Sequence, residues 1–401
     1  MSKAKRILLM MGRHGEWHEL VLGIADYALH RPDWVLDVVA PGPGVIETID
    51  GSDWDGVITH MNTLDTYRTV REWGIPTVNT SQDLPLADMP DIAHTAVDNE
   101  LIGHWVAQYY LERGLSQFAF LGWAGHINSQ QRRRGFCDHL AERAISPALL
   151  ELEAPPIFGP VERSDNDQIL IDWLKTLPAS CGLFACNDAF AFRANRLCGE
   201  AGIRIPEALC IVGVYNDQLI CQLGRPPLSS VELFGRREGW DAARLLDTWL
   251  QSGRLPEPNV VQHPPARLVA RQSSDLLTVT DPHVAKALAF MQRRMAEELS
   301  VNDIVRHVGV NRRTLERHFA MLLRRSPNEE LRRVRVERAK QLLVGTNLPM
   351  SRIAEQCGFC DSQYMSVVFR KQEGVSPTSY RQAYSTWAAP VQPFSTGKGA
   401  R

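Results

Sequence analysis

At 401 residues the chain is too long for one hydrophobic core, so two or three domains are expected. Its apolar fraction of 44% is ordinary for a globular protein, and no run approaches the roughly 18 uncharged apolar residues of a membrane helix. The apolar run at residues 7–11 is too short for the core of a signal peptide, which predicts a cytoplasmic protein with no membrane partner. Eight cysteines at irregular spacings predict reduced thiols.

The net charge of −2 conceals a division of charge along the chain. Residues 281–401 carry 20 Lys and Arg against 11 Asp and Glu, a net charge of +9, so residues 1–280 carry −11. A basic end joined to an acidic remainder indicates a polyanionic partner for the C-terminal end alone. The alternative is a solvated, arginine-rich helical surface.

Residues 6–272 alternate short apolar runs with amphipathic stretches. The runs predict strands at residues 7–11, 35–39, 56–59, 77–79, 118–122, 182–185, 209–214 and 260–262. The stretches between them predict helices at residues 16–30, 99–113, 129–144, 165–177, 188–201 and 235–252. This alternation is typical of parallel sheets with crossover helices, and the length favours two sheets. Ligands of such folds bind beyond the carboxyl ends of the strands, so the segments that follow the strands are expected to converge on one cleft.

The pattern changes after residue 272. Residues 273–282 predict a linker, and only helical patterns follow it. We therefore expect a first domain at 1–272, a helical domain at 283–386 and a disordered tail at 387–401.

A repeated unit lies in the helical domain. Residues 304–310 and 353–359 are similar and lie 49 residues apart, and each unit predicts a short helix, a turn and a second helix. Gly309 and Gly358 suit a turn with positive φ, and Asn311 and Asp361 suit the N-caps of the second helices. Two such units in a basic domain predict DNA binding.

A longer amphipathic helix at residues 328–344 joins the two units. Its apolar residues are expected to form a buried stripe, with Arg332, Arg333 and Arg335 facing outward.

Two segments carry a resemblance to known families. Residues 281–384, which close with Gly-Val-Ser-Pro-Thr-Ser-Tyr-Arg at 374–381, resemble the AraC/XylS-type DNA-binding domain. The N-terminal portion resembles the LacI-type periplasmic-binding-protein fold without that family's N-terminal headpiece. The xylose operon regulatory (XylR) family combines these parts in this order, and the similarity extends along the chain, as at residues 172–178 and 361–364.

The resemblance implies an α/β two-lobed, type I periplasmic-binding-protein-like domain followed by an all-α double helix-turn-helix domain. It implies a transcription regulator and not an enzyme, with activation of sugar catabolism genes favoured over repression. The implied partners are double-stranded operator DNA, RNA polymerase and a second copy of the chain. No cofactor is expected, and the implied effector is D-xylose or another sugar. The alternatives are a polyol or small-metabolite effector and, less favoured, an enzyme that acts on a sugar.

The resemblance assigns DNA contacts to two helices, at residues 312–322 and 361–372. In the first, arginine can bond guanine and Glu316 can accept from cytosine. In the second, Val367 stands where many family members carry Arg, which leaves only an apolar contact such as one to a thymine methyl. The alternative for each polar residue is a solvated face. The expected DNA-contacting residues are Arg312, Arg313, Glu316, Arg317, Ser362, Gln363, Tyr364, Arg370 and Lys371, the last two against phosphates.

Sugar sites combine planar polar groups with an aromatic plate. Arg132 in Arg-x-x-Gly-Phe and Asn187 in Asn-Asp match positions that face the ligand in the LacI-type fold. Tyr215 departs from the pattern, because sugar-binding relatives place Asp there, so Asn216 or Asp217 substitutes or the ligand differs from xylose. The expected ligand-contacting residues are Trp17, Asp98, Trp123, Arg132, Asn187, Tyr215 and Asn216. The alternatives are a plain N-cap for Asp98 and rim packing for the two tryptophans.

Other motifs are set aside. Cys357 and Cys360 form a Cys-x-x-Cys pair, but it falls in the second turn and lacks further ligands, so no metal site is expected. No nucleophile and base stand at an interpretable spacing.

Overall fold

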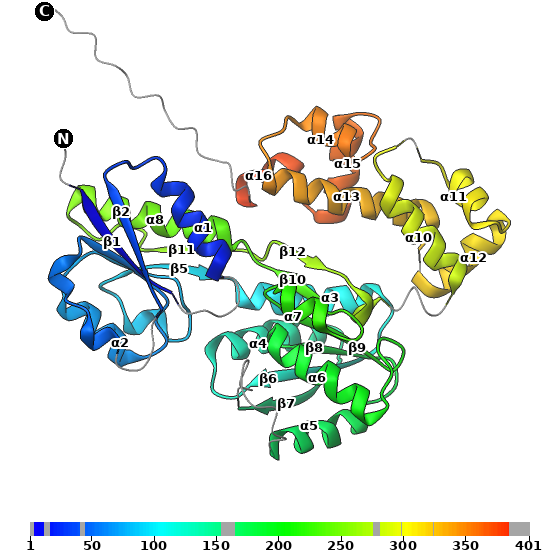
Figure 1. Ribbon diagram of the computed structural model, residues 1–401. Coiled ribbons are helices and arrows are strands. Elements are labelled where there is room, and N and C mark those ends of the chain that lie inside the picture. Colours follow the sequence, from blue (N-terminus) through cyan, green and yellow to red (C-terminus); the bar gives the residue numbers. More distant parts are fainter. Residues whose placement is uncertain are drawn as a thin grey trace, which may run out of the picture. The chain divides into compact units, whose positions relative to one another are not determined.

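The structure is a computed structural model that describes residues 4–11, 17–40, 45–153, 165–275, 281–297, 299–323 and 325–384 (Figure 1). The chain divides into two compact units, residues 1–280 and 281–401. The predicted tail at 387–401 lies outside the described residues. None of the helices among the described residues combines the length and apolar character that a membrane span requires.

The first unit contains two six-stranded sheets, in the orders β11-β5-β4-β3-β1-β2 and β12-β10-β9-β8-β6-β7. The neighbouring strands pair in parallel, except that β10 and β12 are antiparallel. The first sheet consists of β1 (Lys5–Met10), β2 (Trp34–Val39), β3 (Gly56–Thr59), β4 (Thr77–Asn79), β5 (Ala93–Val97) and β11 (Val260–His263). The second consists of β6 (Gln117–Trp123), β7 (Ala148–Leu152), β8 (Cys181–Ala185), β9 (Leu209–Val214), β10 (Ser229–Glu232) and β12 (Arg267–Val269).

Each sheet and its helices form a lobe. The helices of the first lobe are α1 (Trp17–Ala28), α2 (Leu64–Glu72) and α8 (Gly235–Ser252). Those of the second lobe are α3 (Asn99–Glu112), α4 (Ile127–Ala141), α5 (Asp165–Thr176), α6 (Asp188–Ala201) and α7 (Gln218–Leu223). Short 3-10 turns lie at Ile46–Thr48, Gly51–Asp53, Leu86–Asp88 and Gln272–Ser274. The chain passes between the lobes after β5, after β10 and after β11, which confirms the predicted two-lobed α/β class.

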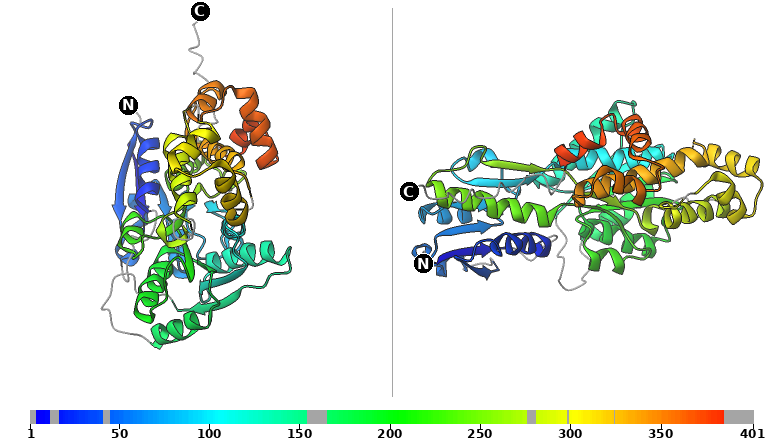
Figure 2. Two further views of the ribbon diagram at one scale, coloured as in Figure 1. Left: turned by 90° about the vertical axis from the view of Figure 1, so that its right-hand side faces the viewer. Right: turned by 90° about the horizontal axis from the view of Figure 1, so that it is seen from above.

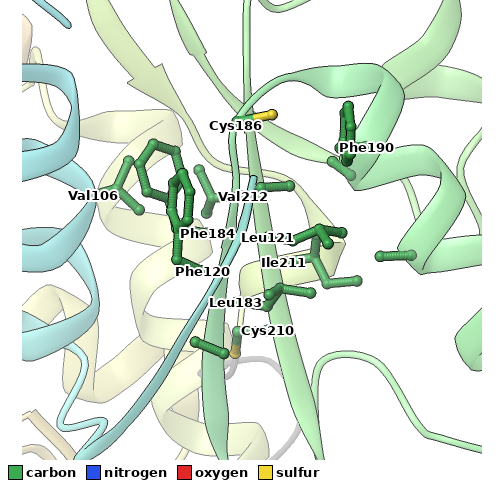
Figure 3. Close-up of a cluster of buried hydrophobic side chains, with 14 of the residues drawn as sticks. Val106, Phe120, Leu121, Leu183, Phe184, Cys186, Phe190, Cys210, Ile211 and Val212 are labelled. Carbon is green, nitrogen blue, oxygen red and sulfur yellow. The ribbon is translucent and has the colours of Figure 1, made fainter. Parts of the chain in front are cut away.

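The second lobe has a core on both faces of its sheet. Figure 3 shows Phe120 and Phe184 beside Val106 of α3, while Leu183 lies on the opposite face, the one that also carries Phe190 of α6. These side chains are buried. Cover by helices on both faces explains why the central strands β8 and β9 are continuous apolar runs.

Glycines allow two helix pairs to cross closely. A Cβ on Gly23 of α1 would lie 1.9 Å from the carbonyl oxygen of Arg236 in α8, and these helices run side by side (Figure 2). A Cβ on Gly135 of α4 would lie 1.9 Å from the carbonyl oxygen of Glu100 in α3. The glycine of Arg-x-x-Gly-Phe therefore sets the approach of α4 to α3, and with it the position of Arg132.

The first unit extends past residue 272. The hydroxyl of Ser273 donates to the carbonyl oxygen of Ile211 at 2.6 Å and accepts from the amide of Ser229 at 2.8 Å. Ser274 bonds the Ser229 hydroxyl at 2.7 Å, and the side chains of both serines are buried. The first two residues of the predicted linker are thus part of this unit, and residues 276–280 of that linker lie outside the described residues.

The second unit is helical, as predicted. Figure 1 shows α13 running between a group formed by α10, α11 and α12 and a group formed by α14, α15 and α16. The helices are α10 (Pro282–Arg294), α11 (Val301–Val308), α12 (Arg312–Leu323), α13 (Pro327–Gly345), α14 (Met350–Gln356), α15 (Ser362–Glu373) and α16 (Pro377–Tyr384).

Both repeats form the predicted helix-turn-helix units. Gly309 and Gly358 have φ of +84° and +74°. The Asn311 carboxamide oxygen accepts from the amide of Thr314 at 2.8 Å, and Asp361 accepts from the amide of Tyr364 at 2.7 Å. These bonds confirm the predicted N-caps of α12 and α15.

The expectation that Arg335 faces outward is wrong. Its Nε donates to the carbonyl oxygen of Met295 at 3.0 Å, and its Nη2 donates to that of Glu297 at 2.9 Å. The side chain folds back because both carbonyls follow the end of α10 and need donors. Arg335 therefore links α13 to the turn before α11.

Candidate functional site

Arg132 of α4 is the centre of a buried polar network at the carboxyl ends of the second sheet. Its Nε donates to Oδ1 of Asn99 at 2.8 Å, and its Nη1 donates to the carbonyl oxygen of Cys186 at 2.5 Å. Its Nη2 donates to the hydroxyl of Tyr215 at 3.3 Å, and the guanidinium carbon lies 4.8 Å from the centre of that ring. Only 2% of the Arg132 surface is exposed. One guanidinium thus fixes the start of α3, the end of β8 and the end of β9.

Two polar contacts next to this network join the lobes. Nδ2 of Asn99 donates to Oε1 of Gln82, which follows β4 of the first lobe, at 3.2 Å. Nε2 of His126, which precedes α4 in the second lobe, lies 3.0 Å from Oδ1 of Asp83. His60 faces the other oxygen of Asp83 at 3.7 Å. The segment after β4 is therefore one place where the first lobe contacts the second.

The carboxyl of Asp83 faces two histidines. Burial alone would raise its pKa, but the hydrogen bond from His126 and the approach of His60 outweigh burial and hold the pKa well below its usual range. Sequence reasoning missed Gln82, Asp83 and Asn99, because no motif marks a contact made across two lobes.

Two predicted ligand residues act as helix caps. The Asp98 carboxylate accepts from the amide of Leu101 at 2.9 Å and caps α3. The carboxamide oxygen of Asn187 accepts from the amide of Phe190 at 2.9 Å and caps α6. The caps hold both side chains at the strand ends, beside the Arg132 network.

Tyr215 and Asn216 follow β9 with φ of +104° and +53°. The carboxamide oxygen of Asn216 accepts from Nη2 of Arg271 at 2.6 Å. The backbone amide of Asn216 donates to the hydroxyl of Ser230 at 2.9 Å. Positive φ at two successive non-glycine residues stores strain, which is typical of functional turns. The turn is what brings the Tyr215 ring over Arg132.

The two predicted stacking residues differ in position. The Trp123 ring, at the end of β6, stacks on His126 with centroids 4.1 Å apart and an interplanar angle of 20°. Trp123 thereby borders the contact between His126 and Asp83. The Trp17 ring lies against His18 at the start of α1, and in the part of the chain that the structure describes no ring contact joins it to Trp123.

Asp188 and Glu238 are buried carboxyls, one in each lobe. Burial raises the pKa of each to about 7. The Ser230 hydroxyl donates to Asp188 at 2.6 Å, and the Thr95 hydroxyl donates to Glu238 at 2.9 Å. Both groups hold their protons to higher pH in the folded chain than in the unfolded chain.

The free energy of unfolding is therefore expected to fall as the pH rises from about 4.5 to 7, because the unfolded chain releases these protons first. Glu238→Gln keeps an acceptor for Thr95 and removes the ionisation. It is expected to reduce this dependence to the part that Asp188 contributes and to stabilise the protein by about 3 kcal/mol at pH 7.5. Urea denaturation across this pH range measures the effect. Glu72→Gln, at an exposed glutamate of α2, should leave the slope unchanged.

The exposed face of α12 is cationic. Arg313 and Arg317 are exposed, and among the described residues neither has an ion pair. Arg312 pairs with Glu316 at 2.8 Å between its Nε and Oε1. Leu315 is fully buried and fixes which side of α12 faces away from the core.

The exposed face of α15 has a different chemistry. One exposed face carries Gln363, Tyr364, Val367, Arg370 and Lys371, at i, i+1, i+4, i+7 and i+8, and Gln372 is exposed as well. The Tyr364 ring packs edge-on against Phe359, with centroids 6.1 Å apart. Ser362 is half-buried at the helix start. The predicted DNA-contacting residues of this helix other than Ser362 therefore share one exposed face.

Comparisons with known proteins match both units. Residues 107–274 match the model of a periplasmic binding protein-like domain, and residues 304–383 match that of a helix-turn-helix domain. The xylose operon regulatory protein of Escherichia coli K12 is 28% identical over 393 residues, which cover 96% of this chain and 98% of that protein. The protein of the same description from Haemophilus influenzae is 31% identical over 339 residues, which cover 84% and 87%. A solved structure described as the xylose-binding transcription activator XylR is 27% identical, with a TM-score of 0.61 over 96% of this chain and 99% of that one.

The two-lobed α/β unit and the double helix-turn-helix unit define the class of this protein, a transcription regulator with a periplasmic binding protein-like domain and an AraC-type DNA-binding domain. Its relatives of known description are regulators and not enzymes. The chain belongs to the family of xylose operon regulatory proteins.

Proposed function

We propose that the chain binds operator DNA through α12 and α15, and that a sugar bound between the two lobes controls this binding. The observation that carries the proposal is the Arg132 network, which gathers polar groups from three elements beside the contacts that join the lobes. The basic second unit, in which α12 and α15 both begin at N-caps, supplies the DNA-binding part of the proposal; we call α12 and α15 the reading helices.

Sugar chemistry fits the groups at the strand ends. A sugar is neutral and rich in hydroxyls, and Arg132, Asn187, Asn216 and Asp98 together offer donors and acceptors to it. Trp123 offers an apolar plate, and Trp17 is a second candidate from the first lobe. The names of the relatives favour D-xylose. Tyr215 favours a change of sugar, because one hydroxyl and a ring replace a carboxylate that could accept two hydroxyls.

The lobes provide a route from sugar to DNA. A ligand that contacts both lobes favours the arrangement in which they are closed, to the extent that it binds that arrangement more tightly. The contacts of Gln82 with Asn99 and of Asp83 with His126 join the two lobes, so closure of the lobes would change them. We propose that the regulator works in the cytoplasm as a homodimer and activates transcription by recruiting RNA polymerase.

A thermal-shift screen of the full-length protein against D-xylose, other pentoses, hexoses and polyols tests the effector. A ligand at 100 times its dissociation constant is expected to stabilise the protein by about 2.7 kcal/mol. Stabilisation by another sugar but not by D-xylose would reject D-xylose as the effector and leave the proposal of a sugar effector in place. No stabilisation by any of them would reject sugar control.

Arg317→Ala is expected to weaken specific DNA binding by about 1–3 kcal/mol and to relax the base preference at one position. The reason is that a bidentate contact between arginine and guanine is lost. Fluorescence anisotropy with a duplex that the protein selects from a random-sequence pool, and with its single-base variants, measures both effects. Arg306→Ala removes an exposed arginine of α11, outside the reading helices, and should not change base preference. An unchanged preference in Arg317→Ala would reject this readout.

The other proposed contacts are Arg312, Arg313, Glu316, Ser362, Gln363 and Tyr364 to bases, with Arg370 and Lys371 to phosphates.

A further inference from the structure

The two reading helices present different side chains at equivalent places. Leu315 and Phe319 of α12 are fully buried, as are Met365 and Phe369 of α15. Met365 follows Leu315 by 50 positions, and Phe369 follows Phe319 by the same number. The helices begin at equivalent caps. A residue of α12 therefore corresponds to the residue 50 positions later in α15.

This correspondence pairs Arg317 with Val367, and Arg313 with Gln363. Val367 is 67% exposed, although its side chain is apolar. On a helical wheel it lies at the middle of the exposed face, because residues at i−4, i−3, i+3 and i+4 surround it. An isolated exposed valine needs no explanation, but one that replaces the central arginine of a paired helix changes what that helix can bind.

The residues around Val367 match a surface that lies against DNA. Arg370 and Lys371 are exposed toward the C-terminal end of the same face and can contact phosphates. Gln363 lies one turn before Val367, and a glutamine amide can bond N6 and N7 of adenine together. The apolar group that the major groove offers is the C5-methyl of thymine. An adenine on one strand and a thymine methyl next to it suit this pair of side chains.

We infer that the two helices read different kinds of base pair: α15 reads an A·T segment through Gln363 and the apolar contact of Val367 with thymine methyls, whereas α12 reads guanine through Arg313 and Arg317. The inference rests on the proposed DNA binding and deepens it. The two segments lie about one helical turn, roughly 34 Å, apart along the duplex.

The test begins with selection of duplexes from a random-sequence pool by the full-length protein, with and without pentoses. The wild-type protein should enrich a site with a guanine segment and, about one turn away, an A·T segment. Arg317→Ala should relax the guanine preference at one position and keep the A·T preference, and Val367→Ser should weaken the thymine preference and keep the guanine preference. Enrichment of guanine in both segments would overturn the inference.

The second step replaces the thymines of the A·T segment with deoxyuridine, which removes only the methyl groups. Anisotropy titration with the wild-type protein should show about a fourfold loss of affinity for each contacted methyl. Val367→Ser removes both methyl groups of the valine side chain and should bind the thymine and uracil duplexes equally. Val38→Ser, at an exposed valine of β2 in the first unit, should keep the wild-type difference.

The outcomes separate this inference from the proposed function. An equal loss on uracil substitution in the wild type and in Val367→Ser, or no loss in either, would overturn the role of Val367 while specific binding persists. Failure to enrich any sequence would overturn the proposed DNA binding itself, and the inference with it.

Discussion

Replacing Arg132 with alanine is expected to abolish the response to the sugar and to lower the free energy of unfolding of the first unit by about 3 kcal/mol. The guanidinium is buried and donates to Asn99, to the carbonyl of Cys186 and to Tyr215, so its removal leaves acceptors without donors. Thermal shift with and without the sugar measures the response, and anisotropy measures DNA binding, which should persist without sugar.

The neighbouring residue supplies a matched control. Arg133 is half-buried and pairs with Glu151 at 3.2 Å, so Arg133→Ala should cost less than about 1 kcal/mol and keep the response. Tyr215→Phe removes one hydroxyl and keeps the ring over Arg132, which separates loss of ligand contact from loss of folding. A normal sugar response in Arg132→Ala would show that the ligand lies elsewhere.

The sequence predicts β3, β4 and β9 with the bounds that the structure has. β9 is a continuous apolar run, as burial on both faces favours, whereas β4 is Thr-Val-Asn with its polar side chains buried. β5 was missed since Ala-His-Thr-Ala-Val has weak strand propensity, yet it is buried between β4 and β11. β7, β10 and β12 were missed as well, and β7 and β12 are edge strands with exposed or half-buried residues. Tertiary pairing and not local preference makes these segments strands.

The residues of the candidate site also fall into two groups, those that the sequence identified and those that it did not. Arg132 was found because a local motif places it, and the glycine of that motif has a visible packing role against α3. Asn99, Gln82 and Asp83 were not found, because their roles depend on contacts between segments far apart in the chain. Pattern reasoning identifies a residue that a local motif marks, but it cannot identify the partner that a fold brings to it.

The error at Arg335 leads to the other large effect, which is expected for Gly358→Ala. An alanine Cβ at Gly358 would lie 2.0 Å from the carbonyl oxygen of Met295, the acceptor of the Arg335 bond, and φ at Gly358 is +74°. Backbone cannot yield as a flexible side chain does. The second helix-turn-helix unit should lose at least about 3 kcal/mol, and specific DNA affinity should fall about 100-fold or more.

Gly309 is the matched control, because it is the equivalent glycine of the first unit. Its φ is +84°, but nothing lies within 4 Å of an added Cβ, so Gly309→Ala pays only the backbone strain of about 1 kcal/mol. Hydrogen–deuterium exchange of α14 and α15 in the full-length protein, together with anisotropy on the selected duplex, measures the difference. Both variants should keep the sugar-induced thermal shift of the first unit. Equal effects of the two substitutions would mean that positive φ alone selects these glycines. A larger effect at Gly358 would mean that the second glycine is also required by the contact between α13 and the turn after α10.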